Sequence, residues 1–360
     1  MESTSAAREL TMLVDYRNHF YMSVHHRDAS MDLELMKKYF RSSGWELVTK
    51  GFPDINFRND NYCGKPVLYQ TSEDRDLFYK SYIEDVLLGL KLQGAVLIPE
   101  FHLFRAHHNK VFMEILRDLS PLQQIKNIKS RGYGTYEDFA KESSLFPSEV
   151  VVKPSEGYGS NGVKLLRDER SRRNYVKRLS RSMHPLDALK DLIRSYVWHC
   201  RKRSNHRRKL IVQNYIRDLH NDYKILVFGN KYYVLCRHNR KHDFRASGSG
   251  LFEYRDDLPE GLLDFAACTF QGFDSPYAAF DVGFNGRDYV LFEFQFVHMG
   301  TYTLEKSPFY FVNDGGRWKK ISGASILEEE LVRSVILYCD KSVSSVAAVS
   351  QKNGGSDICR

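Results

Sequence analysis

The 360-residue sequence has little proline and glycine, no long hydrophobic run and no closely spaced pair of cysteines. Ten prolines and 23 glycines are too few for a low-complexity or collagen-like chain. No apolar run approaches the ~18–20 residues that a membrane span needs, and the N-terminal stretch is a poor secretory signal. The six cysteines are far apart, which predicts reduced thiols in a cytoplasmic protein and argues against a disulfide framework or a zinc site.

Positive charge is concentrated in one segment. The formal net charge is +8, and between Lys164 and Lys209 the sequence has 16 lysines and arginines against four acidic residues. Such a basic block favours an anionic partner, such as phosphate, a nucleotide, a nucleic acid or a lipid head group, or else it forms a solvated helix face. No platform of interleaved aromatic residues supports nucleic-acid binding, so we do not expect that partner.

The first hundred residues alternate between predicted strands and helices. Apolar residues at helical spacing predict a helix over Phe78–Leu92, and a second helix is expected over Met31–Arg41. The predicted strands are Leu10–Tyr16, Trp45–Val48, Gly64–Gln70 and Ala95–Ile98. This alternation predicts a small α/β domain with a parallel sheet, ending near residue 105.

A glycine-rich turn lies between two predicted strands, Val150–Lys153 and Val163–Leu166. The segment Gly157–Gly162 matches the pattern G-x-G-x-x-G. A dinucleotide-binding fold needs a helix after these glycines, whereas a strand follows them here, so the context argues against that fold. In a hairpin, the backbone amides of the glycines can close over phosphate oxygens while Lys153 supplies a positive charge. An ordinary hairpin with a solvated lysine is the alternative.

Acidic side chains interrupt two strongly apolar predicted strands near the end of the chain. Asp281 lies in the first strand, and Glu293 and Gln295 lie in the second. Because strand side chains alternate, Glu293 and Gln295 share one face, and Asp281 can face them from the neighbouring strand. A carboxylate in an apolar strand is costly unless it has a partner. A divalent cation with bound phosphates is one candidate partner, and a buried salt bridge to Arg237 or Arg245 is the other.

Taken in this order, the segments resemble the ATP-grasp superfamily. The segments that carry the resemblance are Val150–Val163, Ile211–Ile216, Asp222–Gly229, Phe280–Gly286 and Val290–Gln295. The resemblance implies a mixed α/β and α+β class: an ATP-grasp fold with an N-terminal Rossmann-like α/β domain. The implied parts are an N-terminal α/β domain (1–106), a first lobe with the glycine-rich loop and a basic insert (107–209), a second lobe with a metal site (210–340) and a flexible tail (341–360).

The resemblance also implies site residues. The positions that match ATP-binding positions are Lys110, Lys153, Gly157, Tyr158, Gly159, Ser160, Asn161, Gly162, Gln213, Asn214, Tyr215, Ile216 and Asp218. The positions that match magnesium ligands are Asp281, Glu293 and Gln295. Arg245 matches an arginine that faces the reacting phosphoryl group, and Arg237 is a second candidate because arginine binds phosphate through two hydrogen bonds. The family usually has Asn where this sequence has Gln295.

The implied reaction is ATP-dependent ligation. Most members of the superfamily activate a carboxylate as an acylphosphate, which an amine attacks to give an amide, ADP and phosphate. We therefore expect a carboxylate–amine ligase that uses ATP and Mg2+, with small-molecule carboxylate and amine substrates that include anionic or phosphorylated compounds. Such proteins contact substrate through the N-terminal domain and variable loops, which here would be Asp15–Arg17, Ser72–Arg75 and His298–Ser307, and for each of these segments a structural role is the favoured alternative.

Two other functions remain open from the sequence. The first is a kinase of the same fold that transfers phosphate to a hydroxyl of an anionic acceptor, which the basic block would suit. The second is a nucleotide-binding scaffold without turnover, which the departure at Gln295 suggests. A homodimer is the default expectation for the oligomeric state.

Overall fold

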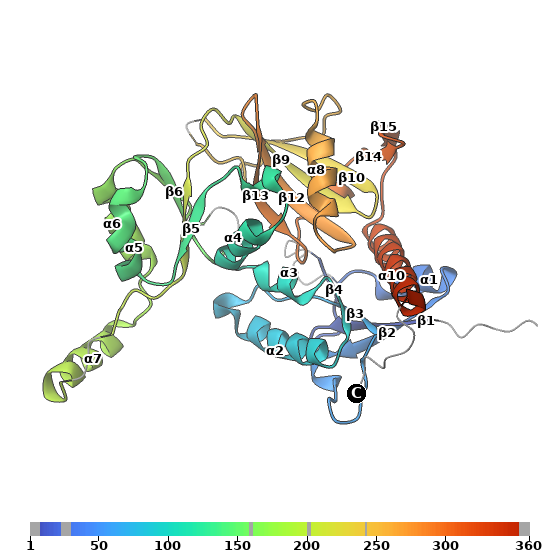
Figure 1. Ribbon diagram of the computed structural model, residues 1–360, viewed down its shortest axis with the longest axis horizontal. Coiled ribbons are helices and arrows are strands. Elements are labelled where there is room, and N and C mark those ends of the chain that lie inside the picture. Colours follow the sequence, from blue (N-terminus) through green and yellow to red (C-terminus); the bar gives the residue numbers. More distant parts are fainter. Residues whose placement is uncertain (1–7, 23–29, 158–160, 200–202, 242, 353–360) are drawn as a thin grey trace, which may run out of the picture.

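The described residues form three sheets, each in a different part of the molecule (Figure 1). The computed structural model describes residues 8–22, 30–157, 161–199, 203–241 and 243–352. Four short 3-10 helices, η1 (Phe52–Asp54), η2 (Arg75–Leu77), η3 (Gln123–Lys126) and η4 (Ser143–Leu145), lie between the main elements.

The N-terminal part is built on a four-stranded parallel sheet in the order β2-β1-β3-β4. Its strands are β1 (Arg8–Val14), β2 (Trp45–Gly51), β3 (Pro66–Tyr69) and β4 (Val96–Ile98). The helices of this part are α1 (Leu33–Ser42), α2 (Phe78–Leu92) and α3 (Phe101–Ala106). Ile83, Leu87 and Leu90 of α2 are buried against the sheet because they recur at helical spacing. The predicted parallel sheet and the helix over Phe78–Leu92 are confirmed.

The second sheet is antiparallel and has the order β5-β8-β6-β7. Its strands are β5 (Ser130–Tyr133), β6 (Val150–Pro154), β7 (Lys164–Leu166) and β8 (Leu210–Asn214), and its helices are α5 (Tyr136–Glu142), α6 (Glu169–Leu179) and α7 (Pro185–Val197). The pairing of β6 with β7 confirms the hairpin around the glycine-rich turn. The sequence placed the boundary between the two lobes between residues 209 and 210, just before β8. Because β8 pairs with β5 and β6, it belongs to the sheet of the first lobe, and the second lobe begins after it.

The third sheet has seven strands in the order β13-β12-β9-β10-β14-β15, with β11 paired to β10. Its strands are β9 (Asn221–Phe228), β10 (Lys231–His238), β11 (Phe252–Glu253), β12 (Tyr277–Phe284), β13 (Tyr289–Gln295), β14 (Phe309–Asp314) and β15 (Arg317–Ser322). The helices near it are α4 (Lys110–Leu119), α8 (Leu262–Gln271) and α9 (Tyr302–Glu305). Met113 of α4 and Leu262 of α8 are buried in the same core as the apolar residues of this sheet, such as Ile225 and Phe280.

The last helix, α10 (Leu327–Lys352), joins the N-terminal part to the second lobe. Leu331 and Val335 share one core with Phe40 of α1 and Leu226 of β9, and Figure 1 shows α10 beside α1. The flexible tail expected over 341–360 stays a prediction, and its first part overlaps this helix, which continues to Lys352. No proline or glycine interrupts the sequence before that point, so nothing ends the helix. Residues 353–360 lie outside the described part of the chain.

The remaining features of the fold are the position of α7, the character of the helices and the state of the cysteines. Figure 1 shows α7 projecting away from the rest of the molecule. Among the described residues, no helix is both long and apolar enough to cross a membrane. Cys236, Cys268 and Cys339 are free thiols, as expected, whereas Cys63 is disulfide-bonded, so the expectation of reduced thiols is wrong at that position.

Candidate active site

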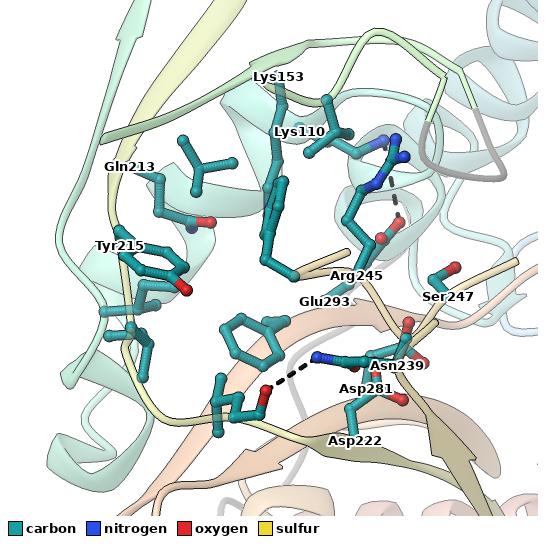
Figure 2. Close-up of a pocket in the computed structure, with 18 of the residues that line it drawn as sticks. Lys110, Lys153, Gln213, Tyr215, Asp222, Asn239, Arg245, Ser247, Asp281 and Glu293 are labelled. Atoms are coloured by element: carbon teal, nitrogen blue, oxygen red, sulfur yellow. Dashed lines mark hydrogen bonds and ion pairs between the residues drawn. The ribbon is translucent and has the colours of Figure 1, made fainter. Parts of the chain in front are cut away.

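A pocket lies between the sheet of the first lobe and the sheet of the second lobe (Figure 2). Its walls come from β6 and β8 on one side, and from β12, β13 and the loop after β10 on the other. The apolar side chains that line it are Ile128, Val151, Val163, Ile216, Leu219, Phe244 and Phe292. Apolar walls with a few polar groups between them suit a flat aromatic ligand.

Two lysines from different elements converge at one end of the pocket. Lys110 is the first residue of α4, and its backbone N–H donates to the carbonyl oxygen of Ser155 at 2.9 Å. Its Nζ donates to the carbonyl oxygen of Gly157 at 2.9 Å and lies 4.0 Å from Oε1 of Glu293. Lys153 enters from β6, and burial lowers the pKa of its ammonium group, while the charge of Glu293 opposes that shift. An anionic ligand would stabilise both charges, so this end of the pocket fits phosphate.

The described ends of the glycine-rich turn lie at this end of the pocket. Gly157 and Asn161 line the pocket. Gly157 has φ 109° and Gly162 has φ 71°, which are backbone conformations that favour glycine. A Cβ at Gly162 would also lie 3.1 Å from Cγ of Pro154. Gly162 itself lies outside the lining of the pocket. The predicted residues Tyr158, Gly159 and Ser160 lie outside the described part of the chain.

The end of β8 forms the opposite end of the pocket. Gln213, Asn214, Tyr215 and Ile216 all line it. Gln213 is 2% exposed, and its Nε2 has no hydrogen-bond partner among the described residues, so this buried donor is available to a ligand. Oδ1 of Asn214 accepts from the backbone N–H of Lys129 at 2.6 Å, so this side chain holds the chain leading into β5.

Tyr215 and Asp218 have different surroundings. The ring of Tyr215 meets the ring of Phe244 edge to face, with centroids 6.0 Å apart. Asp218 lies at the outer mouth of the pocket and not in its lining. Of the predicted ATP-binding positions, Asn214 therefore lines the pocket, although its side-chain oxygen accepts from the backbone, and Asp218 lies farther out.

The acidic residues of the second lobe face one another as their strands predict. Asp281 of β12 is the direct cross-strand partner of Glu293 of β13, and a β-bulge follows between Asp281 and Val282. Both residues line the pocket. Nε2 of Gln295 donates to Oε1 of Glu293 at 3.0 Å, which confirms that these two side chains share a face. The three residues thus form a group of oxygen donors, which suits a hard cation such as Mg2+.

Asp281 also has the salt bridge that the sequence left open as an alternative. Nη2 of Arg237 lies 2.9 Å from Oδ2 of Asp281, and Nζ of Lys224 lies 3.6 Å from Oδ1. Burial raises the pKa of Asp281, but the charges of Arg237 and Lys224 outweigh burial and hold the pKa below its usual range. The carboxylate is therefore ionised and oriented, as a metal ligand needs to be.

Solved structures with the same arrangement of elements are known. Comparison of the sequence with models of protein families and with curated proteins finds no match. The structure of the D-cycloserine synthetase DcsG superposes with a TM-score of 0.52 at 13% identity, covering 92% of this chain and 99% of that chain. The ATP-grasp ligase PsnB, complexed with a minimal precursor, Mg and ADP, superposes with a TM-score of 0.50 at 11% identity, covering 92% of this chain and 98% of that chain. The chain has the ATP-grasp fold. The resemblance seen in the sequence is thus confirmed for the fold.

Within this ATP-grasp fold, the two predicted arginines are placed differently. Arg237 is 6% exposed, and its guanidinium donates to both carboxylate oxygens of Asp222, at 2.6 and 2.8 Å. Since Arg237 also contacts Asp281, it positions this acidic side chain, and it does not line the pocket between the two lobes. Arg245, on the loop after β10, does line the pocket, where it pairs with Asp243 at 2.8 Å.

A second cavity of about 690 Å³ meets the first at the acidic pair. The residues that line both cavities are Lys110, Gly157, Ser247, Asp281 and Glu293. Gln295 and Arg237 line the second cavity alone. The two cavities therefore share a wall that carries Lys110 and the acidic pair.

Several lining residues were not predicted from the sequence. Asn239 and Ser247 line the pocket between the two lobes, and both lie in the segment after β10. Nδ2 of Asn239 donates to the carbonyl oxygen of Leu219 at 2.8 Å. They lie in a loop without periodicity, so no pattern marks them. Part of the basic block, namely Lys164, Arg167 and Arg178, lines the outer mouth of the pocket together with Asp218.

Proposed function

We propose that this protein is an ATP-dependent ligase that joins a carboxylate to an amine through an acylphosphate. The observation that carries the proposal is the meeting of two cavities at Lys110, Asp281 and Glu293. A triphosphate between the lobes would end at this junction, and a second substrate would approach it from the other cavity. The likeness of the fold to that of PsnB, an ATP-grasp ligase, supports the same proposal.

The nucleotide would lie with its base between the apolar walls, near the unpaired Nε2 of Gln213. Lys110 and Lys153 would neutralise the phosphates, and Arg245 would contact them from the loop after β10. Asp281 and Glu293, with Gln295 beside them, would hold Mg2+, which when bound neutralises charge on the transferring phosphoryl group. The remaining contribution of the chain is positioning and electrostatic stabilisation, which requires no side-chain nucleophile.

The proposed reaction has two steps. A carboxylate oxygen attacks the γ-phosphorus and the bond to ADP breaks, which leaves an acylphosphate. The amine nitrogen then attacks the acyl carbon, loses a proton and expels phosphate, so that phosphate carries away one oxygen of the original carboxylate. We propose small-molecule carboxylate and amine substrates.

Removal of one lysine tests the nucleotide site. We expect Lys153→Met to weaken ATP binding and to lower ADP formation by about 100-fold or more, because a charge-assisted contact to phosphate is lost from a water-poor pocket. The matched control is Lys141→Met, since Lys141 is 74% exposed and pairs with Asp138 on the surface. ATP affinity by calorimetry and ADP release by a coupled assay measure the effect. Equal activity of the two variants would contradict the site.

Oxygen transfer tests the reaction type. With a carboxylate substrate labelled with oxygen-18, the ligase reaction places one labelled oxygen in the released phosphate, and ADP release depends on the amine. A kinase would transfer phosphate to a hydroxyl and release no labelled phosphate. A scaffold would bind ATP and Mg2+ without forming ADP. Either of these last two results would refute the ligase while leaving the nucleotide site in place.

A further inference from the structure

Four side chains from three distant segments converge on one point in the wall of the second cavity. Glu73 precedes η2 in the N-terminal part, His107 and His108 connect α3 to α4, and His298 follows β13. Nε2 of His107 lies 3.1 Å from Oε1 of Glu73, and Nε2 of His108 lies 3.3 Å from the same oxygen. Nδ1 of His298 lies 3.7 Å from it. Three imidazole rings thus surround a single carboxylate oxygen.

Contacts within the protein leave several buried polar atoms of this cluster without a hydrogen-bond partner. The side chains of His107 and His298 are 1% exposed, and that of Glu73 is 8% exposed. Oε2 of Glu73, Nδ1 of His107 and Nε2 of His298 have no hydrogen-bond partner among the described residues. Buried polar atoms without partners are rare and costly, and each one indicates a missing partner such as an ion or a water molecule.

The distances fit tetrahedral coordination. Zinc bonds of about 2.0–2.2 Å to nitrogen and oxygen place neighbouring ligand atoms of a tetrahedron about 3.4 Å apart. The three distances from Oε1 of Glu73, which are 3.1, 3.3 and 3.7 Å, bracket that value. The donor atoms of Glu73, His107 and His108 all lie within 4.8 Å of one another.

The backbone places two of the rings at a conformational cost. His108 has φ 52° and His298 has φ 44°. Residues other than glycine are uncommon in this left-handed region, and they persist where the surroundings determine them. Both strained residues belong to the same cluster, which indicates that the strain serves to aim their rings at Glu73.

We propose that Glu73, His107, His108 and His298 form a binding site for a divalent transition-metal ion of the zinc class. Imidazole ligands select such ions over Mg2+, so this site is distinct from the oxygen ligands of Asp281 and Glu293. Glu73, His107 and His108 form the group of mutually close ligand atoms, and His298, 3.7 Å from Oε1 of Glu73, would be the fourth ligand that closes a structural site. The ion would tie the N-terminal part to the segment between α3 and α4 and to the second lobe, and it would fix one wall of the second cavity. The site does not depend on the proposed ligase reaction.

Metal content of the full chain, purified without a histidine tag, tests this site. We expect one Zn2+ per chain by mass spectrometry after dialysis against metal-free buffer. After chelation, Co2+ should bind in its place and give the intense visible absorption of tetrahedral coordination without a thiolate charge-transfer band. Such a band would instead place the metal at Cys236, His238 and Glu253, the other group of candidate ligands among the described residues, and would refute the proposal.

Variants identify the ligands. His298→Ala and Glu73→Ala should weaken Zn2+ binding by more than about 100-fold, since changes to outer-shell partners alone cost 10- to 100-fold. The matched control is His102→Ala, because His102 lies on α3 but is 45% exposed and outside the cluster. Zn2+ should raise the Tm of the original chain and of the control, and leave the Tm of the two variants unchanged.

Two results would overturn the proposal. One is an original chain that binds neither Zn2+ nor Co2+ and shows no metal-dependent change of Tm, a measurement that holds even if the variants fail to fold. The other is full metal content in His298→Ala. In either case the four residues are a hydrogen-bonded cluster around an ionised Glu73.

Discussion

Buried charges on single residues differ in how well the surrounding structure compensates them. Arg237 is buried, but two carboxylates, Asp222 and Asp281, surround its guanidinium and raise its pKa although burial opposes this. Lys80 of α2 is 3% exposed, and its Nζ lies 4.5 Å from the centre of the Phe104 ring. Burial lowers the pKa of Lys80 from 10.5 to about 8, and the charge of Glu84 offsets only part of this effect. Lys80 is therefore a residue at which the charge itself destabilises the fold.

Replacing Lys80 by methionine should stabilise the protein. The lowered pKa corresponds to at most about 3 kcal/mol at neutral pH, at about 1.4 kcal/mol per pKa unit, reduced by the lost contact with Phe104. Because the folded pKa of about 8 lies below the unfolded value of 10.5, the unfolded chain binds more protons in this interval. The original chain thus gains stability as the pH rises from 8 to 10.5, and the advantage of the variant shrinks.

Urea unfolding of both chains at about pH 7 and about pH 10 measures this effect. Because both chains contain the same other titratable groups, the contribution of those groups cancels in the difference between the two unfolding free energies. An advantage of Lys80→Met that is equal at both pH values would show that packing, and not the charge of Lys80, is responsible.

At the scale of elements, the relative position of α4 and β13 determines the geometry of the candidate site, because α4 carries Lys110 and β13 carries Glu293. Arg117 of α4 is fully buried and connects these two elements. It donates to Glu114 at 2.8 Å and to the carbonyl oxygens of Ile125 at 2.9 Å and Leu291 at 2.7 Å. The helix that begins with Lys110 is thus fixed to the strand that carries Glu293.

We expect Arg117→Met to destabilise the protein by about 3–5 kcal/mol, because it leaves the buried carboxylate of Glu114 without its cation. The double variant Glu114→Gln, Arg117→Met removes that carboxylate charge as well and should be less destabilised than the single variant. Both variants should bind ATP more weakly, since α4 and β13 lose a shared contact. Denaturant unfolding and ATP calorimetry check this. A double variant less stable than the single one would contradict the explanation.

The sequence predicted elements where apolar residues recur regularly, and missed them where they do not. The helix over Phe78–Leu92 and the hairpin of β6 and β7 were predicted because burial determines their pattern. Helix α6 was missed because its sequence is highly charged and only Arg172 and Val176 are buried. Strand β5 was missed because two of its four residues, Arg131 and Gly132, are exposed.

The site shows the same division. Asp281 and Glu293 were identifiable because an acid in an apolar strand needs a partner, and the alternation of side chains relates neighbouring positions. The cluster of Glu73, His107, His108 and His298 gave no such signal. Its residues come from three segments that only the packing of the N-terminal part against the second lobe brings together.

The N-terminal part shares cores with the second lobe, the first lobe has a core of its own, and none of the described side chains of α7 belongs to these cores. Figure 1 shows α7 extending from the first lobe, away from the rest of the molecule. Its side chains are exposed although many are apolar: Leu186 is 65% exposed and Tyr196 is 85% exposed. In the described part of the chain, the hydrogen bond of Ser195 to the carbonyl oxygen of Leu192 and the ion pair of Lys190 with Asp187 both stay within α7. The helix therefore contributes little to the stability of the body.

Excision of this helix should leave the body intact. The chain on either side of it meets at a backbone hydrogen bond of 3.0 Å from Ser182 to Asn205, so a short glycine–serine linker of about four residues can replace residues 184–203. We expect the free energy of unfolding to change by less than about 1 kcal/mol, since almost no buried apolar surface is lost. ATP affinity should be unchanged, because no described residue of α7 lines the pocket between the two lobes, where we propose that ATP binds.

Thermal unfolding and ATP calorimetry on the excised and full chains make the comparison. As a matched control, replacing the neighbouring helix α6 by a similar linker should unfold the first lobe, because Val176 of α6 is fully buried in the core of that lobe. A large loss of stability or of ATP affinity on excision of α7 would mean that this helix supports the first lobe through contacts with residues outside the described part of the chain. The site would then depend on the projecting segment, and the two lobes alone would be insufficient for nucleotide binding.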